Sequence, residues 1–120
     1  MSGIKKLIAL AQKYVDFKDM VNHKARWDIK RKEPWEETIG TEYPGYDVEV
    51  IYRDLIVTPE NLGNITYGYL GAANGIPLNI LYFGSYYAAG MPIGGAKFEN
   101  ELLDQTYIAY GYDAYFRDYD

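Results

Sequence analysis

The chain has no cysteine and a single histidine, His23. Without cysteine it can form no disulfide, bind no metal through thiolates and use no thiol nucleophile. One histidine leaves no multi-histidine metal site and no pair of catalytic histidines. No apolar run reaches about 18 residues, so the sequence predicts no membrane span, and the apolar part of residues 1–10 is too short to predict a signal peptide. There is no phosphate-binding loop, zinc motif or serine elbow.

Basic residues are scarce outside the first quarter of the chain. Residues 1–32 carry nine lysines and arginines against three aspartates, whereas residues 33–120 carry three against fourteen acids, and the net charge is −5. A basic segment on an acidic body suits a polyanion on one side and a basic partner on the other. The same lysines are equally consistent with the solvated face of a helix.

Tyrosine is the main aromatic residue, because there are 14 tyrosines and only 4 phenylalanines and 2 tryptophans. Tyrosine combines an apolar ring with a hydroxyl that needs a partner, so many of these residues are expected at walls, clefts and interfaces. The 120 residues are predicted to form one domain, spanning 1–120, that buries about two-thirds of its unfolded surface.

The most informative stretch covers residues 58–77 and predicts a helix with both ends marked. Thr58 can cap the first turn, Pro59 suits the first helical position, and Gly75 can close the helix in a left-handed conformation. Glycines nevertheless interrupt the interior, each costing about 1 kcal/mol relative to alanine; they are Gly63, Gly68 and Gly71.

These interior glycines have two explanations. Asn64, Gly68, Gly71 and Gly75 fall on one stripe at helical spacing, so some other group must approach that backbone closely. The first explanation is another helix packed tightly against the small residues. The second is a site at the close approach, lined by Asn64 and Tyr67.

Hydrophobic periodicity predicts three further helices and one hairpin. Helices are expected over residues 3–22, from Pro77 to about Ala89, and from about Phe98 to Phe116. Residues 46–57 alternate as in a small β-hairpin, whereas residues 34–37 are expected in a loop. The predicted fold is therefore mostly α (α+β), a compact domain of about four helices with one small β-hairpin between helices 1 and 2.

The segment Trp27-Asp28-Ile29-Lys30 places an acid and a base two residues apart beside a large aromatic side chain. If the segment is extended, Asp28 and Lys30 point to the same side. There Asp28 can accept a proton and Lys30 can stabilise developing negative charge. The alternative is a surface ion pair worth less than about 1 kcal/mol.

Three other acids are candidates for a function. Glu36 and Glu37 offer carboxylates for a metal ion or for acid–base work on a glycosidic bond, or are solvated loop acids. Asp104 lies inside a predicted helix, where aspartate is a poor helix former, and this favours a functional task.

Several of these pieces occur together in an order that resembles the bacterial polymorphic toxin type 44 domain. The resemblance covers about residues 14–115, and its most specific part is Gly-Asn-Ile-x-Tyr-Gly-Tyr-x-Gly. The chain departs from the family pattern at residues 83–87, where a Gly-Ala-Gly-rich helix is usual, and before the last helix, where only Asp104 remains of Asp-Asp-Pro-x-Asp. The matching pieces are Phe17 and Val21, Trp27 to Lys30, Glu60 to Gly71, and Asp104 through Ile108 to Gly111.

The resemblance implies a biological role. Domains of this family form the C-terminal part of large secreted proteins that bacteria use against competitors. It implies that this domain has an upstream carrier protein, is secreted from the producer, acts in the target bacterium and is neutralised by a cognate immunity protein.

Three biochemical functions stay open. In a nuclease, favoured with RNA as the substrate, the basic segment contacts phosphates, Lys30 stabilises the scissile phosphate and Asp28 acts as the base. In a peptidoglycan hydrolase, Asp28 pairs with Glu36 or Glu37. The third is a non-catalytic protein-binding module.

One cleft is predicted where the glycine-rich helix meets the N-terminal segment. The sequence identifies no metal ligands and leaves open whether a divalent metal ion is needed. The residues predicted to bind substrate are Trp27, Arg26, Glu36 and Glu37. Those predicted to be catalytic are Asp28, Lys30, Asn64, Tyr67 and Asp104.

Overall fold

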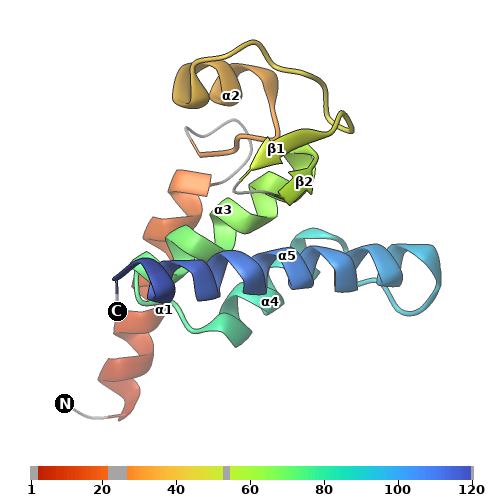
Figure 1. The fold of residues 1–120 in the computed structure, drawn as a ribbon. Coiled ribbons are helices and arrows are strands. Elements are labelled where there is room, and N and C mark those ends of the chain that lie inside the picture. The colour runs from red at the N-terminus through yellow and green to blue at the C-terminus, as the bar shows by residue number, and fades with distance from the viewer. Residues whose placement is uncertain (1–2, 22–26, 53–54, 120) are drawn as a thin grey trace.

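The computed structural model of the protein describes residues 3–21, 27–52 and 55–119. In Figure 1, α2 (Lys32–Ile39) and the hairpin form one end of the molecule, and α3 (Pro59–Ala73) and α5 (Gly95–Tyr119) cross near its centre. None of the helices in these ranges is both long enough and apolar enough to cross a membrane. In chain order the elements are α1 (Gly3–Val21), α2 (Lys32–Ile39), β1 (Val50–Tyr52), β2 (Leu55–Val57), α3 (Pro59–Ala73), α4 (Leu78–Ala88) and α5 (Gly95–Tyr119).

Helix α3 has the end signals that its sequence predicts. Thr58 Oγ1 accepts a hydrogen bond from the backbone N–H of Asn61 at 3.2 Å, and Pro59 occupies the first helical position. Past the other end, Gly75 has φ +74°, a conformation that glycine adopts without steric cost. Both signals are local, which is why the sequence alone reveals them.

Two clusters of buried side chains flank α3. One lies toward α2 and the hairpin, and α3 contributes Leu62 and Ile65 to it. The other joins α1, α4 and α5, and its buried members are Phe17, Ile76, Leu81 and Ile108. Because both clusters pack against it, α3 is the element around which the domain is built.

Two glycines of α3, Gly68 and Gly71, pack against neighbouring helices. A Cβ at Gly68 would overlap the carbonyl oxygen of Ile108, and a Cβ at Gly111 would overlap the carbonyl oxygen of Ile65. The backbones of α3 and α5 therefore touch on both sides of one crossing. Tight helix packing, the first explanation for the glycines, is confirmed at Gly68 and Gly71.

The fold class is confirmed as mostly α with a small two-stranded hairpin, but the described residues form five helices instead of about four. The loop predicted over residues 34–37 was wrong, because those residues lie in α2. Pro34 falls in the first turn, where its missing N–H breaks no helical bond. Trp35 is buried, and Gly40 ends the helix with φ +87°.

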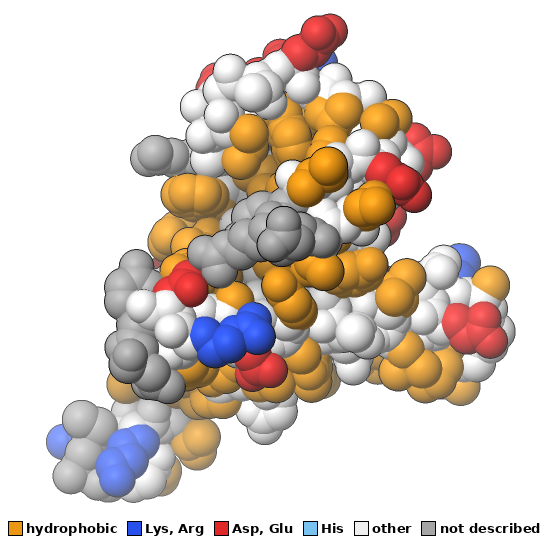
Figure 2. All heavy atoms as spheres, in the orientation of Figure 1, with side chains coloured by type: hydrophobic (Ala, Val, Ile, Leu, Met, Phe, Trp, Pro, Cys, Tyr) orange, Lys and Arg blue, Asp and Glu red, His pale blue; other side chains and the backbone are white. Residues whose placement is uncertain are grey.

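The hairpin lies between α2 and α3 and is shorter than the alternating sequence indicates. Its antiparallel strands pair Val50 with Val57 and Ile51 with Ile56. On the face shown in Figure 2, hydrophobic side chains are exposed near the hairpin and along α5. Ile51 is 81% exposed and Ile56 is 66% exposed, so one side of the hairpin is an uncovered apolar surface.

Candidate functional site

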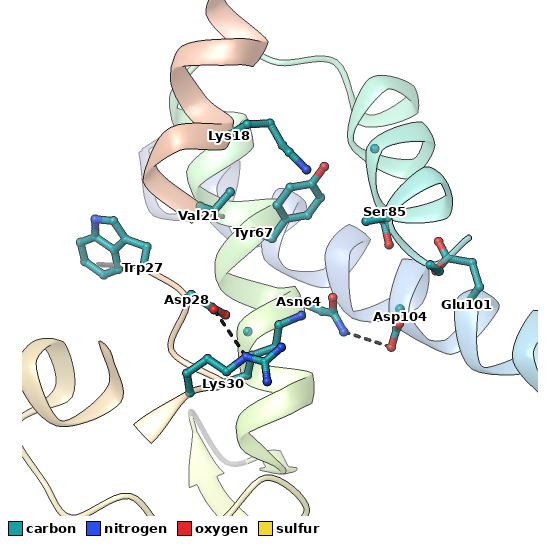
Figure 3. Close-up of a pocket in the computed structure, with 15 residues that line it drawn as sticks. Lys18, Val21, Trp27, Asp28, Lys30, Asn64, Tyr67, Ser85, Glu101 and Asp104 are labelled. Carbon is teal, nitrogen blue, oxygen red and sulfur yellow. Dashed lines mark hydrogen bonds and ion pairs between the residues drawn. The ribbon is translucent and has the colours of Figure 1, made fainter. Parts of the chain in front are cut away.

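A pocket of about 420 Å³ opens where α1, the turn at residues 27–31, α3, α4 and α5 meet. Its volume is in the range of small-molecule binding sites. Figure 3 shows the side chains around it. The structure brings together all five residues predicted to be catalytic, because each of them lines this pocket: Asp28, Lys30, Asn64, Tyr67 and Asp104. Their catalytic role stays a prediction.

The segment that carries Asp28 and Lys30 is a turn, so the extended conformation that would point both side chains to one side is not present. The N–H of Arg31 donates to the carbonyl oxygen of Asp28 at 3.1 Å. The hydroxyl of Tyr43 donates to the carbonyl oxygen of Lys30 at 2.6 Å. The side chain of Lys30 runs over Gly63, where an added Cβ would lie 3.4 Å from the Cβ of Lys30. The glycine therefore leaves room for the lysine at the pocket.

Asp28 is buried, and its carboxylate forms an ion pair with Arg31. The Nε of Arg31 lies 3.6 Å from Oδ2 of Asp28. Arg31 also lines the pocket, although the sequence argument did not select it. Its only signal in the sequence is its place in the basic run from Lys30 to Lys32, and a run of charges does not show which member turns inward.

Asn64 and Asp104 meet across the pocket. The Nδ2 of Asn64 on α3 donates to Oδ1 of Asp104 on α5 at 3.0 Å, as Figure 3 shows. Each residue lies one helical turn from the contact between Gly68 and Ile108. The close crossing of the two helices therefore holds these side chains within hydrogen-bonding distance.

The pKa of Asp104 is raised. Burial, with the negative charges of Glu60 and Glu101, raises it to about 6, while Lys30 and the hydrogen bond from Asn64 oppose the rise. A carboxyl group that titrates near neutral pH can both accept and release a proton under physiological conditions. Such perturbed acids in a cleft are candidates for acid–base catalysis.

The hydroxyl of Tyr67 forms hydrogen-bond contacts with other helices of the domain. It donates to the carbonyl oxygen of Leu81 on α4 at 2.9 Å and lies 3.4 Å from the hydroxyl of Tyr14 on α1. Burial and the contact with Tyr14 raise its pKa, so the hydroxyl stays protonated. Tyr67 thus links three helices at the wall of the pocket.

Glu101 is a pocket residue that the sequence argument missed. It is only 2% exposed, and its Oε1 accepts a hydrogen bond from Nε2 of Gln105 at 3.2 Å. Its Oε2 is buried and has no hydrogen-bond partner among the described residues. Its spacing of three residues from Asp104 puts both on one helix face, and that was the available signal.

The residues predicted to bind substrate do not all lie at the pocket. Trp27 lines the pocket, whereas Glu36 and Glu37 do not. Glu36 accepts a hydrogen bond from the backbone N–H of Tyr43 at 3.0 Å, and Glu37 is exposed on α2. The structure therefore does not bring either glutamate to Asp28, and Arg26 lies outside the described residues.

A second pocket, of about 610 Å³, lies between α2, the hairpin and α3. Trp27 lines both pockets, and the other walls of the second include Trp35, Val50 and Leu62. None of the described residues lining it is charged, so it offers mainly apolar contact and no carboxylate or ammonium group. The first pocket is therefore the candidate active site.

Within ranges 3–21, 27–52 and 55–119, no three or more His, Cys, Asp or Glu side chains are grouped in a way that could hold a metal ion. In comparisons with known proteins, no family model, curated protein or solved structure shows a significant match to the chain. The resemblance to the type 44 toxin domain therefore stays a prediction from the sequence.

Proposed function

We propose that the domain is a nuclease that acts on RNA. The proposal depends on the environment of Asp104, which has a pKa of about 6 and accepts a hydrogen bond from Asn64. Asp104 is thus a candidate acid–base group in a pocket that is also lined by cationic side chains. Three cationic side chains line that pocket, Lys18, Lys30 and Arg31. All three belong to the basic N-terminal segment, so the acidic balance of the whole chain does not extend to the pocket.

The cations fit a phosphodiester. An ammonium group such as that of Lys30 can stabilise the negative charge that develops on the non-bridging phosphate oxygens. A guanidinium such as that of Arg31 can bind two phosphate oxygens at once. Asp28, whose carboxylate pairs with Arg31, then orients that guanidinium and is not itself the base.

Asp104 takes the role of base in this proposal. At neutral pH a carboxyl group with a pKa of about 6 is mostly ionised and can accept a proton. The ribose 2′-hydroxyl gives its proton to Asp104 while its oxygen forms a bond to phosphorus. The bond from phosphorus to the 5′-oxygen breaks, and that oxygen takes up a proton from water. Asn64 holds the Asp104 carboxylate in position throughout.

A peptidoglycan hydrolase is the second candidate, and one observation favours it. Three carboxylates line the pocket, those of Asp28, Glu101 and Asp104. Glycosidic hydrolysis needs two carboxyl groups with separated pKa values. Asp104 could be the protonated acid of such a pair, although the cations of the pocket have no task in that reaction.

Direct incubation separates the two candidates. The purified domain is incubated separately with total RNA, plasmid DNA and peptidoglycan, and products are followed by electrophoresis or chromatography. We expect RNA to be cut by the natural chain and not by Asp104→Asn. Asp113→Asn is the matched control, because Asp113 is an exposed aspartate on the same helix. Release of glycan fragments with intact RNA would favour the hydrolase.

We further propose that the domain is the effector of a bacterial polymorphic toxin, delivered by an upstream carrier protein and neutralised by a cognate immunity protein. The support is the resemblance of residues 14–115 to the type 44 domain. A reaction that degrades RNA would harm the producing cell, so an inhibitory partner is the expected companion.

A further inference from the structure

One oxygen of the buried Glu101 carboxylate has no hydrogen-bond partner, whereas the other, Oε1, accepts from Gln105. The Glu101 side chain is 2% exposed, and no described residue donates to its Oε2. No ion pair joins Glu101 to a lysine or arginine of the described ranges either. An unsatisfied buried carboxylate oxygen destabilises a fold, and a functional role is one of the explanations for such an atom in a native protein.

The Glu101 carboxylate lies near Asp104, whose pKa it raises, but it points in another direction. In Figure 3 it points toward Ser85 of α4, whereas Asp104 points toward Asn64 of α3. All four residues line the same pocket. One ligand can therefore reach both regions, with its reacting group at Asp104 and a second group at Glu101.

We propose that Glu101 binds the Watson–Crick edge of a guanine base next to the phosphodiester that is cleaved. The inference depends on the proposed nuclease for its substrate class. It makes Glu101 a specificity-determining residue and leaves proton transfer to Asp104.

Guanine is the base whose edge matches a carboxylate. An ionised carboxylate only accepts hydrogen bonds, and guanine presents two adjacent donors, N1–H and the N2 amine. Adenine and cytosine each place a ring-nitrogen acceptor beside their amine, and the N3–H of uracil lies between two carbonyl oxygens. Those acceptors would face the carboxylate and repel it. RNA-binding proteins read the edges of unstacked bases in this way.

The binding test uses the four ribonucleoside monophosphates and isothermal titration calorimetry. We expect GMP to bind at least about tenfold more tightly than AMP, CMP and UMP, as one good contact to a base edge allows. Glu101→Gln replaces one acceptor by a donor, so it should remove this preference. Glu99→Gln makes the same change at an exposed position of the same helix and should keep the preference.

Melting temperature distinguishes recognition from a structural role. If Glu101 serves the ligand, Glu101→Gln removes a buried carboxylate that has no ion-pair partner among the described residues and should leave the melting temperature unchanged or higher. If Glu101 stabilises the fold, the same variant should melt at a lower temperature, and that result would count against the proposal.

Cleavage of short RNAs with a single guanine separates this inference from the proposed function. Cutting beside guanine that becomes indiscriminate in Glu101→Gln supports both. Cutting without base preference overturns the guanine assignment and leaves the nuclease standing. Selective GMP binding without any cleavage overturns the nuclease while keeping Glu101 as a base-binding residue. If none of the four nucleotides binds, the inference fails whatever the activity.

Discussion

Asp104 and Asn64 are the residues on which the proposed reaction depends most directly, because their hydrogen bond joins the two sides of the pocket. Asp104→Asn keeps the shape of the side chain and removes its ability to accept a proton. We expect RNA cleavage to fall by about 10²–10⁴-fold, the usual contribution of a general base. The melting temperature should not fall, because a half-buried carboxyl group that is costly to ionise is replaced by a neutral one. Equal loss of activity and of folding would instead assign Asp104 to the structure.

The raised pKa of Asp104 predicts how activity depends on pH. Cleavage by a carboxylate base should rise as pH increases through about 6 and then level off. The rate profile of the natural chain, measured from pH 4 to pH 8, tests this, and Asp104→Asn should lack that step. A maximum below pH 5 would assign the protonated form of the residue to the reaction.

The raised pKa of Asp104 also affects how the free energy of unfolding depends on pH. The direction of this dependence is opposite to that for an acid whose pKa is lowered by a salt bridge. The pKa of Asp104 rises from an ordinary value of 3.8 to about 6 in the folded chain. Between these two values the folded state binds more protons than the unfolded state, so its stability falls as pH rises. Denaturant titrations at pH 4 and pH 6.5 should show a smaller fall for Asp104→Asn than for the natural chain.

At the scale of elements, the close contact between α3 and α5 can be tested by adding a methyl group at Gly68. Gly68→Ala would place a methyl group against the carbonyl oxygen of Ile108, and neither backbone can move away without disturbing the core. We expect a loss of about 1–3 kcal/mol in the free energy of unfolding, as for other overpacked sites. Gly3→Ala is the control, because nothing lies near a Cβ at that helical position. Equal effects of the two substitutions would contradict the close crossing.

The sequence predicts elements best where their signals are local. Thr58, Pro59 and Gly75 mark the ends of α3 through neighbouring backbone atoms, so they could be read directly. Helix α2 was missed because Pro34 suggested a loop, whereas burial of Trp35 against distant residues stabilises a helix. The strands are shorter than the alternation suggests because only three residue pairs meet.

The candidate site was predictable to a similar extent. Residue type and helical spacing selected Asn64, Tyr67 and Asp104, and the structure places them around one pocket. Glu101 was not selected, because its burial and its missing hydrogen-bond partner depend on how α5 packs against the rest of the domain. The sequence shows only that Glu101 lies three residues from Asp104 on one helix face, and this spacing does not reveal its burial.

At the scale of the whole molecule, the proposed toxin role predicts an effect on growth. Expression of the domain alone should inhibit bacterial growth, and Asp104→Asn should relieve the inhibition at equal soluble levels. Co-expression of the immunity protein should restore growth of cells that make the natural chain. The uncovered hairpin residues Ile51 and Ile56 are consistent with a protein partner, since exposed apolar surface marks such contacts. Normal growth with soluble domain in both cytoplasm and periplasm would argue against a toxin.

Gly68 contacts the backbone of α5, and Gly111 contacts the backbone of α3. These contacts also determine which wall of the pocket can adapt to a substrate. Contact between two backbones has no side-chain rotamer to adjust, so the distance between α3 and α5 is fixed before anything binds. Helix α4 is held at this wall by softer contacts, among them the hydrogen bond from Tyr67 to Leu81. Recognition should therefore be lock-and-key along the side of Asn64 and Asp104. Any induced fit should come from α4, where Ser85 lines the pocket.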